Sequence, residues 1–204
     1  FKAFVEFCPS EQVGIALALH AAGWRIALMS EKPAEDETVR EALSRMPGAV
    51  HVTHDVSNVD GVPEALDAVE TGIGPVTTLV SNAGVPAMSR GDLLDVTTES
   101  FDRCIDVNLR GAFFLIQEVA RRMLGSAPDA YRSILVVTSV SAEIISPDRA
   151  EYCISKAGAS MMTKAVAARL APEGIGVYEL RPGIIRTPMT GPVAERYDTR
   201  IAEG

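Results

Sequence analysis

Short apolar runs alternate along the chain with longer segments in which apolar residues recur at helical spacing. The short runs predict strands over Phe4–Phe7, Arg25–Ser30, Val50–Asp55, Thr77–Ser81, Ser133–Thr138 and Gly176–Leu180. The longer segments predict helices over Glu35–Met46, Val62–Glu70, about Thr98 to Leu124, Arg149–Leu170 and Pro192–Ala202. Strands this apolar, each followed by a helix, are typical of a parallel sheet that is covered on both faces.

The pattern therefore predicts the α/β fold class, with a doubly wound parallel sheet in three layers. The 204 residues suit one such domain over the whole of 1–204, and no repeat or low-complexity linker divides them. Folds of this class bind ligands at the carboxyl ends of their strands. Functional side chains are therefore expected directly after the strands.

The composition excludes several classes of partner. A net charge of −8 argues against nucleic acid, which binds clustered Lys and Arg. No apolar run approaches the roughly 18 residues of a membrane span, so no membrane partner is expected. Cys8, Cys104 and Cys153 show no C-x-x-C spacing and favour a reducing, cytoplasmic location. His51 and His54 lie three residues apart on a strand and point to opposite faces, so no metal site is expected.

A tyrosine and a lysine lie four residues apart in the predicted helix after the fifth strand. This spacing puts Tyr152 and Lys156 on one face of the helix. A phenol has an unperturbed pKa of about 10, and a neighbouring ammonium lowers that pKa towards the range of a general acid–base group. The pair alone is also compatible with two surface neighbours, because such pairs are common in helices.

Ser139 makes the catalytic interpretation specific. It closes the strand that ends Val136-Val137-Thr138 and precedes Tyr152 by 13 positions. A hydroxyl at the end of a strand and a tyrosine near the start of the next helix can reach one crevice. The arrangement resembles that of the short-chain dehydrogenase/reductase family, in particular its members similar to 3-oxoacyl-(acyl-carrier-protein) reductase, whose Ser precedes Tyr-x-x-x-Lys by such an interval.

Other motifs follow in the order of that family. They are Asp55-Val56, which matches a pair that contacts the adenine; Ser81-Asn82-Ala83-Gly84, which resembles Asn-Asn-Ala-Gly; Asn108, which matches the helix asparagine; and Pro182-Gly183 with Ile185 and Thr187, which match the segment on the carboxamide. The resemblance implies a Rossmann-type oxidoreductase that passes hydride between a nicotinamide cofactor and a carbonyl or alcohol substrate.

The resemblance also implies a role for each catalytic residue. Tyr152 would exchange a proton with the substrate oxygen, and Ser139 would hydrogen-bond that oxygen. Lys156 would hold the ribose and lower the pKa of Tyr152, while Asn108 would bend its helix and support a water chain. Family members pair through the helices that carry Asn108 and Tyr152, which implies a homodimer or homotetramer.

Both ends of the chain depart from the family pattern. The first strand leads into Cys8-Pro9-Ser10-Glu11-Gln12-Val13, where the family has a glycine-rich loop for the pyrophosphate, and only Gly14 is present. The loop is therefore atypical, and the family's usual last strand is expected to be lacking. Ser30 ends the second strand at a position where NAD-preferring relatives tend to carry Asp. The neutral Ser30 slightly favours NADP over NAD, although the negative charge of Glu31 opposes NADP.

Two alternatives remain beside a ketoreductase. The departure at the glycine-rich loop favours a catalytically impaired relative that serves as a binding or oligomerisation module, whereas the complete set of Asn108, Ser139, Tyr152 and Lys156 favours an active enzyme. Nucleotide-sugar epimerases and dehydratases share the Tyr-x-x-x-Lys pair. The short chain leaves little room for the larger substrate domain that those enzymes carry.

Overall fold

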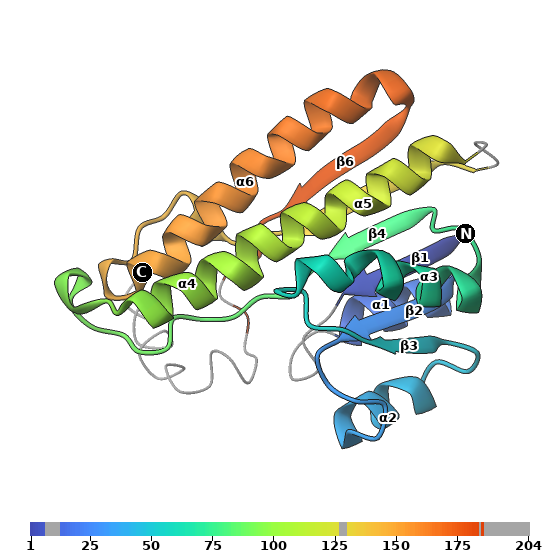
Figure 1. The fold of residues 1–204 in the computed structure, drawn as a ribbon, viewed down its shortest axis with the longest axis horizontal. Helices are drawn as coiled ribbons and strands as arrows, with labels where there is room; N and C mark the ends of the chain where they lie inside the picture. The colour runs from blue at the N-terminus through green and yellow to red at the C-terminus, as the bar shows by residue number, and fades with distance from the viewer. Residues whose placement is uncertain (7–12, 127–129, 184, 186–204) are drawn as a thin grey trace.

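The structure is a computed structural model that describes residues 1–6, 13–126, 130–183 and 185. Its strands form one parallel sheet in the order β3-β2-β1-β4-β5-β6 (Figure 1). These strands are β1 (Lys2–Glu6), β2 (Arg25–Ser30), β3 (Val50–Thr53), β4 (Thr78–Ser81), β5 (Arg132–Val137) and β6 (Ile175–Leu180). The helices are α1 (Val13–Ala21), α2 (Glu37–Ser44), α3 (Val62–Ile73), α4 (Thr98–Ile105), α5 (Ala112–Gly125) and α6 (Ala150–Leu170).

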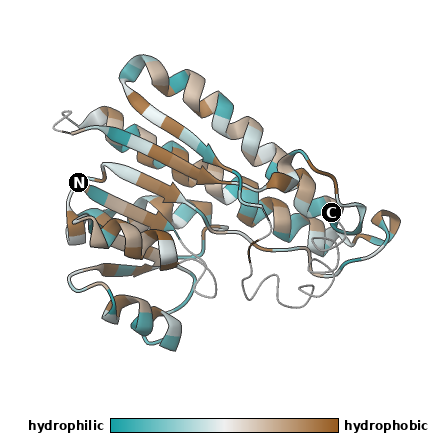
Figure 2. Ribbon diagram, turned by 180° about the vertical axis from the view of Figure 1, so that it is seen from behind, coloured by the Kyte–Doolittle hydropathy of each residue, from teal (hydrophilic) through white to brown (hydrophobic). Residues whose placement is uncertain are grey.

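The helices cover both faces of this sheet, as predicted. Successive residues of β1 point to opposite faces, so that Phe4 joins a core with α3, α5 and α6, whereas Ala3 and Val5 join a core with α1 and α2. Brown, apolar positions fill the strands in Figure 2, which agrees with a sheet buried on both sides. The α/β, doubly wound class is confirmed. The atypical loop expected after β1 and the region expected to lack a last strand lie outside the described residues.

The centre of the sheet is the point where its strand order reverses. β1 pairs with β2 on one side and with β4 on the other, and all these pairs are parallel. The carboxyl ends of all six strands therefore lie at one edge of the sheet, where Glu6, Ser30 and Ser81 end their strands. Crevices at such a reversal are where doubly wound folds bind ligands.

The largest departure from the predicted elements is in one helix. The helix expected from about Thr98 to Leu124 consists of α4 and α5 joined by a π-helical turn, Asp106–Gly111. Gly111 lies against the backbone of the segment after β3: a Cβ at this position would lie 2.5 Å from the carbonyl oxygen of Val56. The wider turn therefore lies at a place where helix and loop backbones approach more closely than a side chain permits.

We expect Gly111→Ala to destabilise the fold by about 1–3 kcal/mol, because the atom in its way is backbone and cannot rotate aside. Thermal unfolding of the two proteins measures the difference. Gly125→Ala, at the end of α5, is the matched control, since a Cβ at Gly125 meets nothing within 4 Å. Equal melting temperatures for wild type and Gly111→Ala would contradict the steric account.

Candidate active site

The side chain of Asn108 ties three segments together inside the protein. Its Oδ1 accepts a hydrogen bond from the backbone N–H of Val85 at 2.7 Å, and its Nδ2 donates to the carbonyl oxygen of Val85 at 3.0 Å and to Ser155 Oγ at 2.9 Å. Ser155 Oγ in turn donates to the carbonyl oxygen of Tyr152. The π-helical turn, the loop after β4 and the start of α6 are thereby held by one buried amide.

Two cations lie beside the ring of Tyr152, which is 9% exposed. Lys156 Nζ is 5.9 Å and the Arg149 guanidinium carbon 5.1 Å from the ring centroid. Lys156 is buried and donates to the carbonyl oxygen of Val137 at 3.3 Å. Burial lowers the pKa of Lys156 to about 8, while the charge of Glu6 opposes this shift. Lys156 therefore keeps an ammonium close to Tyr152 at neutral pH.

Ser139 begins a tight turn directly after β5. Its Oγ accepts a hydrogen bond at 3.1 Å from the backbone N–H of Ser141, the second residue of the 3₁₀ turn Val140–Ala142. This turn packs against α6, and Arg149 donates to Ser141 Oγ at 3.0 Å. Arg149 therefore contacts both the Ser139 turn and the ring of Tyr152, which links the two predicted catalytic positions.

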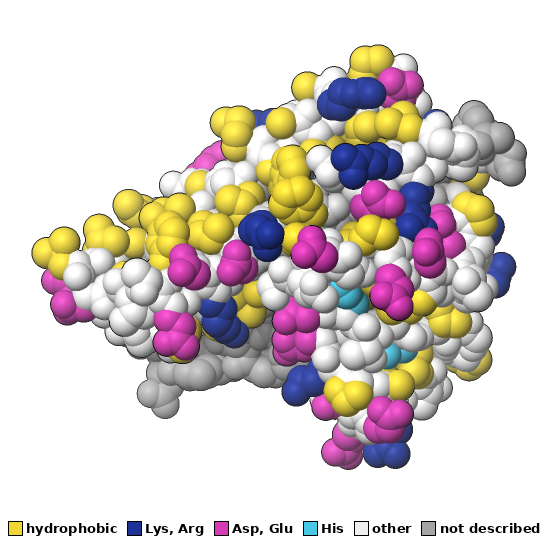
Figure 3. Space-filling view, in the orientation of Figure 1, with side chains coloured by type: hydrophobic (Ala, Val, Ile, Leu, Met, Phe, Trp, Pro, Cys, Tyr) yellow, Lys and Arg dark blue, Asp and Glu magenta, His cyan; other side chains and the backbone are white. Residues whose placement is uncertain are grey.

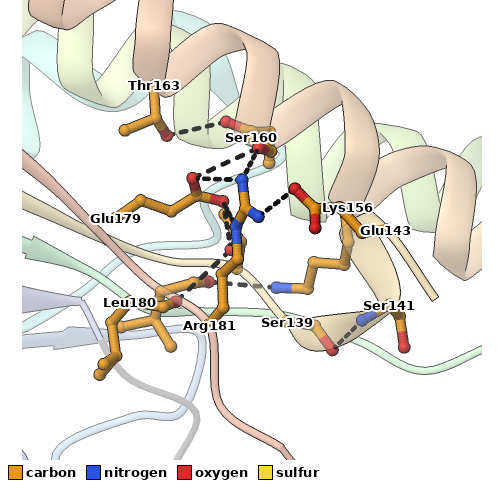
Figure 4. Close-up of polar contacts among 12 residues, drawn as sticks. Ser139, Ser141, Glu143, Lys156, Ser160, Thr163, Glu179, Leu180 and Arg181 are labelled. Carbon is orange, nitrogen blue, oxygen red and sulfur yellow. Dashed lines mark hydrogen bonds and ion pairs between the residues drawn. The ribbon is translucent and has the colours of Figure 1, made fainter.

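A second arginine anchors the same turn from β6. Arg181 donates to both carboxylate oxygens of Glu179, at 2.8 and 2.9 Å, to Ser160 Oγ at 2.8 Å and to Glu143 (Figure 4). Hydrogen bonds from Arg181, Thr138 and Ser160 hold the pKa of Glu179 below its usual value. The end of β6, the middle of α6 and the segment after Ser139 are therefore held in one polar network.

A cavity of about 60 Å³ opens at the carboxyl ends of the central strands. Of the residues predicted to bind the cofactor, five line it together: Ser30, Asp55, Val56, Ala83 and Gly84. Gly84 also adjoins the catalytic positions, because a Cβ there would lie 3.3 Å from Lys156 Nζ and 3.4 Å from Asn108 Oδ1. The predicted cofactor and catalytic groups therefore meet at this glycine.

Asn82 offers the clearest fit to a bound nucleotide. Its side chain is buried, at 3% exposure, and among the described residues neither Oδ1 nor Nδ2 has a hydrogen-bond partner. A buried amide without partners is costly, so a ligand group that satisfies it is favoured. Together with the cavity and the close approach at Gly84, this amide fits a nicotinamide nucleotide at the end of β4.

Glu6, at the carboxyl end of β1, also lines this cavity and is almost wholly buried. Its Oε2 accepts a hydrogen bond from Ser81 Oγ at 2.9 Å, whereas Oε1 has no partner of acceptable geometry among the described residues. Burial raises the pKa of Glu6 to about 7, against the opposing effects of Ser81, the Ala83 and Asn82 amides and Lys156. The cavity therefore holds a carboxyl that titrates near neutral pH.

The remaining predicted positions lie around this centre. Pro182 accepts a hydrogen bond from the backbone N–H of Val140 at 3.0 Å, which places it beside the Ser139 turn. Gly183 and Ile185 are exposed. Thr187 and the helix predicted over Pro192–Ala202 lie outside the described residues.

The sequence analysis missed Glu6, Arg149 and Arg181 as parts of the site. The available signal was a charged residue at the carboxyl end of an otherwise apolar strand: Glu6 is the last residue of β1, and Glu179 and Arg181 flank Leu180, the last residue of β6. Cys104 and Cys153 are free thiols and are buried. Within the described ranges, no group of three or more His, Cys, Asp or Glu could hold a metal ion, and no helix is long and apolar enough to cross a membrane.

Comparison with known proteins gives the same outline. The sequence profile of a family described as enoyl-(acyl carrier protein) reductase matches residues 13–203. The human L-xylulose reductase is 35% identical over 178 residues, which cover 86% of this chain and 68% of that protein. A 3-oxoacyl-(acyl-carrier-protein) reductase of Staphylococcus epidermidis is 30% identical over 191 residues, which cover 93% of this chain and 76% of that protein.

Solved structures agree over almost the whole chain. The 3-oxoacyl-(acyl-carrier protein) reductase of Brucella melitensis in complex with NAD superposes with a TM-score of 0.91 at 39% identity, covering 100% of this chain and 81% of that one. An actinorhodin polyketide ketoreductase with NADPH superposes with a TM-score of 0.85 at 29% identity, covering 97% and 75%. These similarities extend across the whole site described above.

Proposed function

Since this chain belongs to the short-chain dehydrogenase/reductase family of NAD(P)-dependent oxidoreductases that act on CH–OH groups, we propose that it is a ketoreductase for a 3-oxoacyl-type carbonyl. Its catalytic set consists of Asn108, Ser139, Tyr152 and Lys156. The observation that carries this proposal is the buried Lys156 ammonium, 5.9 Å from the Tyr152 ring and next to Gly84 of the cavity.

Tyr152 acts as the proton donor to the carbonyl oxygen, and as the acceptor in the oxidising direction. The positive charges of Lys156 and Arg149 beside the ring favour the phenolate form of Tyr152, which is the form that accepts a proton in the oxidising direction. The bound nicotinamide supplies or accepts the hydride. The protein itself contributes the proton, which it holds on the hydroxyl oxygen of Tyr152.

Ser139 and Asn108 orient the reacting groups. Ser139 hydrogen-bonds the substrate oxygen, and its turn is fixed by Arg149 through Ser141 and by Pro182 through Val140. Asn108 keeps the loop after β4 against α6, and in this way sets the position of Gly84 relative to Lys156. Ser30, Asp55, Val56, Asn82, Ala83, Gly84, Pro182, Gly183, Ile185 and Thr187 form the proposed cofactor site, with Tyr152 and Lys156 at its inner end.

We expect Tyr152→Phe to lower kcat on a 3-oxoacyl thioester by about 10²–10⁴-fold, because the variant keeps the ring but loses the proton. Steady-state turnover with NADPH measures the loss, and fluorescence titration checks that NADPH still binds. Tyr178→Phe is the matched control, since this exposed tyrosine on β6 bonds only Tyr131 among the described side chains. Full turnover by Tyr152→Phe would exclude Tyr152 as the acid–base group.

The same measurement separates the alternatives. Reduction of a ketose in preference to a 3-oxoacyl thioester would favour the chemistry for which the L-xylulose reductases among its relatives are named. A folded chain that binds neither NADPH nor NADH would favour the impaired binding module. The loop on which that alternative depends, residues 7–12, lies outside the described residues.

For the cofactor we propose a slight preference for NADP over NAD. The side chain of Ser30 is buried and neutral, and its hydroxyl is hydrogen-bonded to His51 Nε2 at 3.0 Å, so it brings no charge against a 2′-phosphate. Glu31, on the same cavity, is exposed and acidic and opposes the phosphate.

NADPH should therefore bind a few-fold more tightly than NADH, and Glu31→Gln should widen this ratio by strengthening NADPH binding while leaving NADH nearly unchanged. Calorimetric titration of both nucleotides measures the ratio. Glu35→Gln, an exposed carboxylate that does not line the cavity, serves as the control. A strong preference of the wild type for NADH would overturn the proposal.

We also propose that the chain forms a homodimer or homotetramer through α4–α5 and α6. Hydrophobic side chains gather over these helices in Figure 3. Their exposed members include Phe101, Phe113, Phe114, Ile154 and Met161, of which Met161 is 64% exposed. Monomers rarely leave so many large apolar side chains together in water, so a second copy is the proposed cover.

Light scattering should give a mass that is a multiple of the 21.7 kDa chain. The substitutions Phe113→Lys and Met161→Lys should each shift the mass towards the monomer, because each would bury an unpaired charge in the interface. Tyr131→Lys, an equally exposed aromatic position at the start of β5, should leave the mass unchanged. A monomeric wild type at micromolar concentration would refute this assembly.

A further inference from the structure

The carboxyl of Glu6 occupies the crevice in which the proposed function places the cofactor. Glu6 is 2% exposed at the end of the central strand β1 and lines the cavity together with Ala83 and Gly84. In doubly wound nucleotide-binding folds, the diphosphate lies at the turn that follows the first strand. A buried acid therefore lies at the end of the strand, next to the place where a doubly negative group is expected to bind.

Placing two charges of the same sign in a buried site costs free energy. A neighbouring anion disfavours a carboxylate and favours its protonated form. Because Glu6 is buried, little water lies between it and a ligand in the cavity to screen this repulsion. Protonation removes the repulsion, and it also gives the carboxyl a hydrogen-bond donor, whereas Oε1 has no partner of acceptable geometry among the described residues.

We propose that Glu6 takes up one proton from solvent when the nicotinamide nucleotide binds, so that its carboxylate becomes a neutral carboxylic acid. This proposal rests on the proposed cofactor site. It makes cofactor binding and proton binding to Glu6 two linked events, each strengthening the other.

In the free protein, Glu6 can take up such a proton near neutral pH. Burial raises the pKa of Glu6 to about 7, so at pH 8 most molecules carry the carboxylate. Binding of an anion raises this pKa further. The affinity is therefore highest below about pH 7, falls by about tenfold per pH unit as the pH rises through the window between the two pKa values, and is constant above the pKa of the complex.

Other groups around Glu6 titrate as well and must be distinguished from it. From α6, Lys156 has a pKa lowered to about 8 and favours the Glu6 anion. From the segment after β3, His54 has a pKa lowered by burial, and the exposed Asp55 lies beside it. From the segment after β2, Glu31 is exposed at the rim; from β4, Ser81 contributes only a hydroxyl. Of these, His54 and Lys156 are the rival proton acceptors.

The experiment is calorimetric titration with NADH at pH 8 in buffers of different ionisation enthalpy, which counts protons taken up per NADH bound. NADH is the probe because, unlike NADPH, it has no phosphate monoester that titrates near neutral pH. We expect a large fraction of one proton for the wild type. We expect close to none for Glu6→Gln, which keeps an acceptor for Ser81 but cannot be protonated.

His54→Gln and Glu151→Gln are the control variants. His54→Gln tests one rival acceptor, and Glu6→Gln tests the other, because uptake by Lys156 would persist in that variant. Glu151→Gln makes the same chemical change at another buried carboxyl, which bonds Ser100 Oγ and does not line the cavity. Both control variants should retain the uptake of the wild type. Uptake that persists in Glu6→Gln, or that disappears in His54→Gln instead, overturns the proposal.

A second measurement on the wild type alone does not depend on how the variants fold. The infrared difference spectrum between NADH-bound and free protein at pH 8 should show a new carbonyl band of a protonated carboxylic acid. Binding without this band and without proton uptake overturns the role of Glu6 and leaves the proposed function standing. Absence of NADH binding overturns both.

Discussion

The buried amide of Asn108 is the interaction on which the rest of the site depends. It satisfies both backbone groups of Val85 and reaches Ser155 in α6, so that three segments far apart in sequence share one side chain. Without it, the loop after β4 would lose the hydrogen bonds that hold it next to Lys156, and several buried polar groups would be left unpaired. A single residue therefore holds the loop that carries Gly84 of the cavity against the helix that carries Tyr152 and Lys156.

Two arginines hold the segment after β5 in place. Arg149 and Arg181 both act on the segment after β5, the first through Ser141 and the second through Glu143. Arg181 also bonds Glu179 of β6 and Ser160 of α6, so it connects the segment after β5 to both elements. Polar groups that are connected in this way rigidify a site, because displacement of Arg181 would leave its partners Glu179 and Ser160 without these hydrogen bonds.

The sequence allowed most of the fold and the centre of the site to be predicted. Strands such as Arg25–Ser30 were recognisable because they are apolar, short and followed by turns, and Tyr152 with Lys156 was recognisable because helical spacing brings them to one face. The π-helical turn could not be predicted in this way. The close approach of the Val56 carbonyl to Gly111 at this turn joins residues 55 positions apart and exists only in the packed chain. Glu6 was missed for a related reason: its burial and its proton affinity are set by the neighbours that folding provides.

The π-helical turn has a consequence for how this protein tolerates insertions and deletions. A π-helical turn takes up about one residue more than the α-helical turn it replaces, so α4 and α5 form one continuous path with an extra residue between them. Loss of one residue from Asp106–Gly111 would restore a regular helix with Leu115, Ile116 and Val119 still facing the core, yet the shorter turn would no longer place both Asn108 against Val85 and Gly111 against the Val56 carbonyl. Length in this segment is therefore constrained as tightly as residue identity, although we assign a catalytic role to Asn108 alone among its six residues.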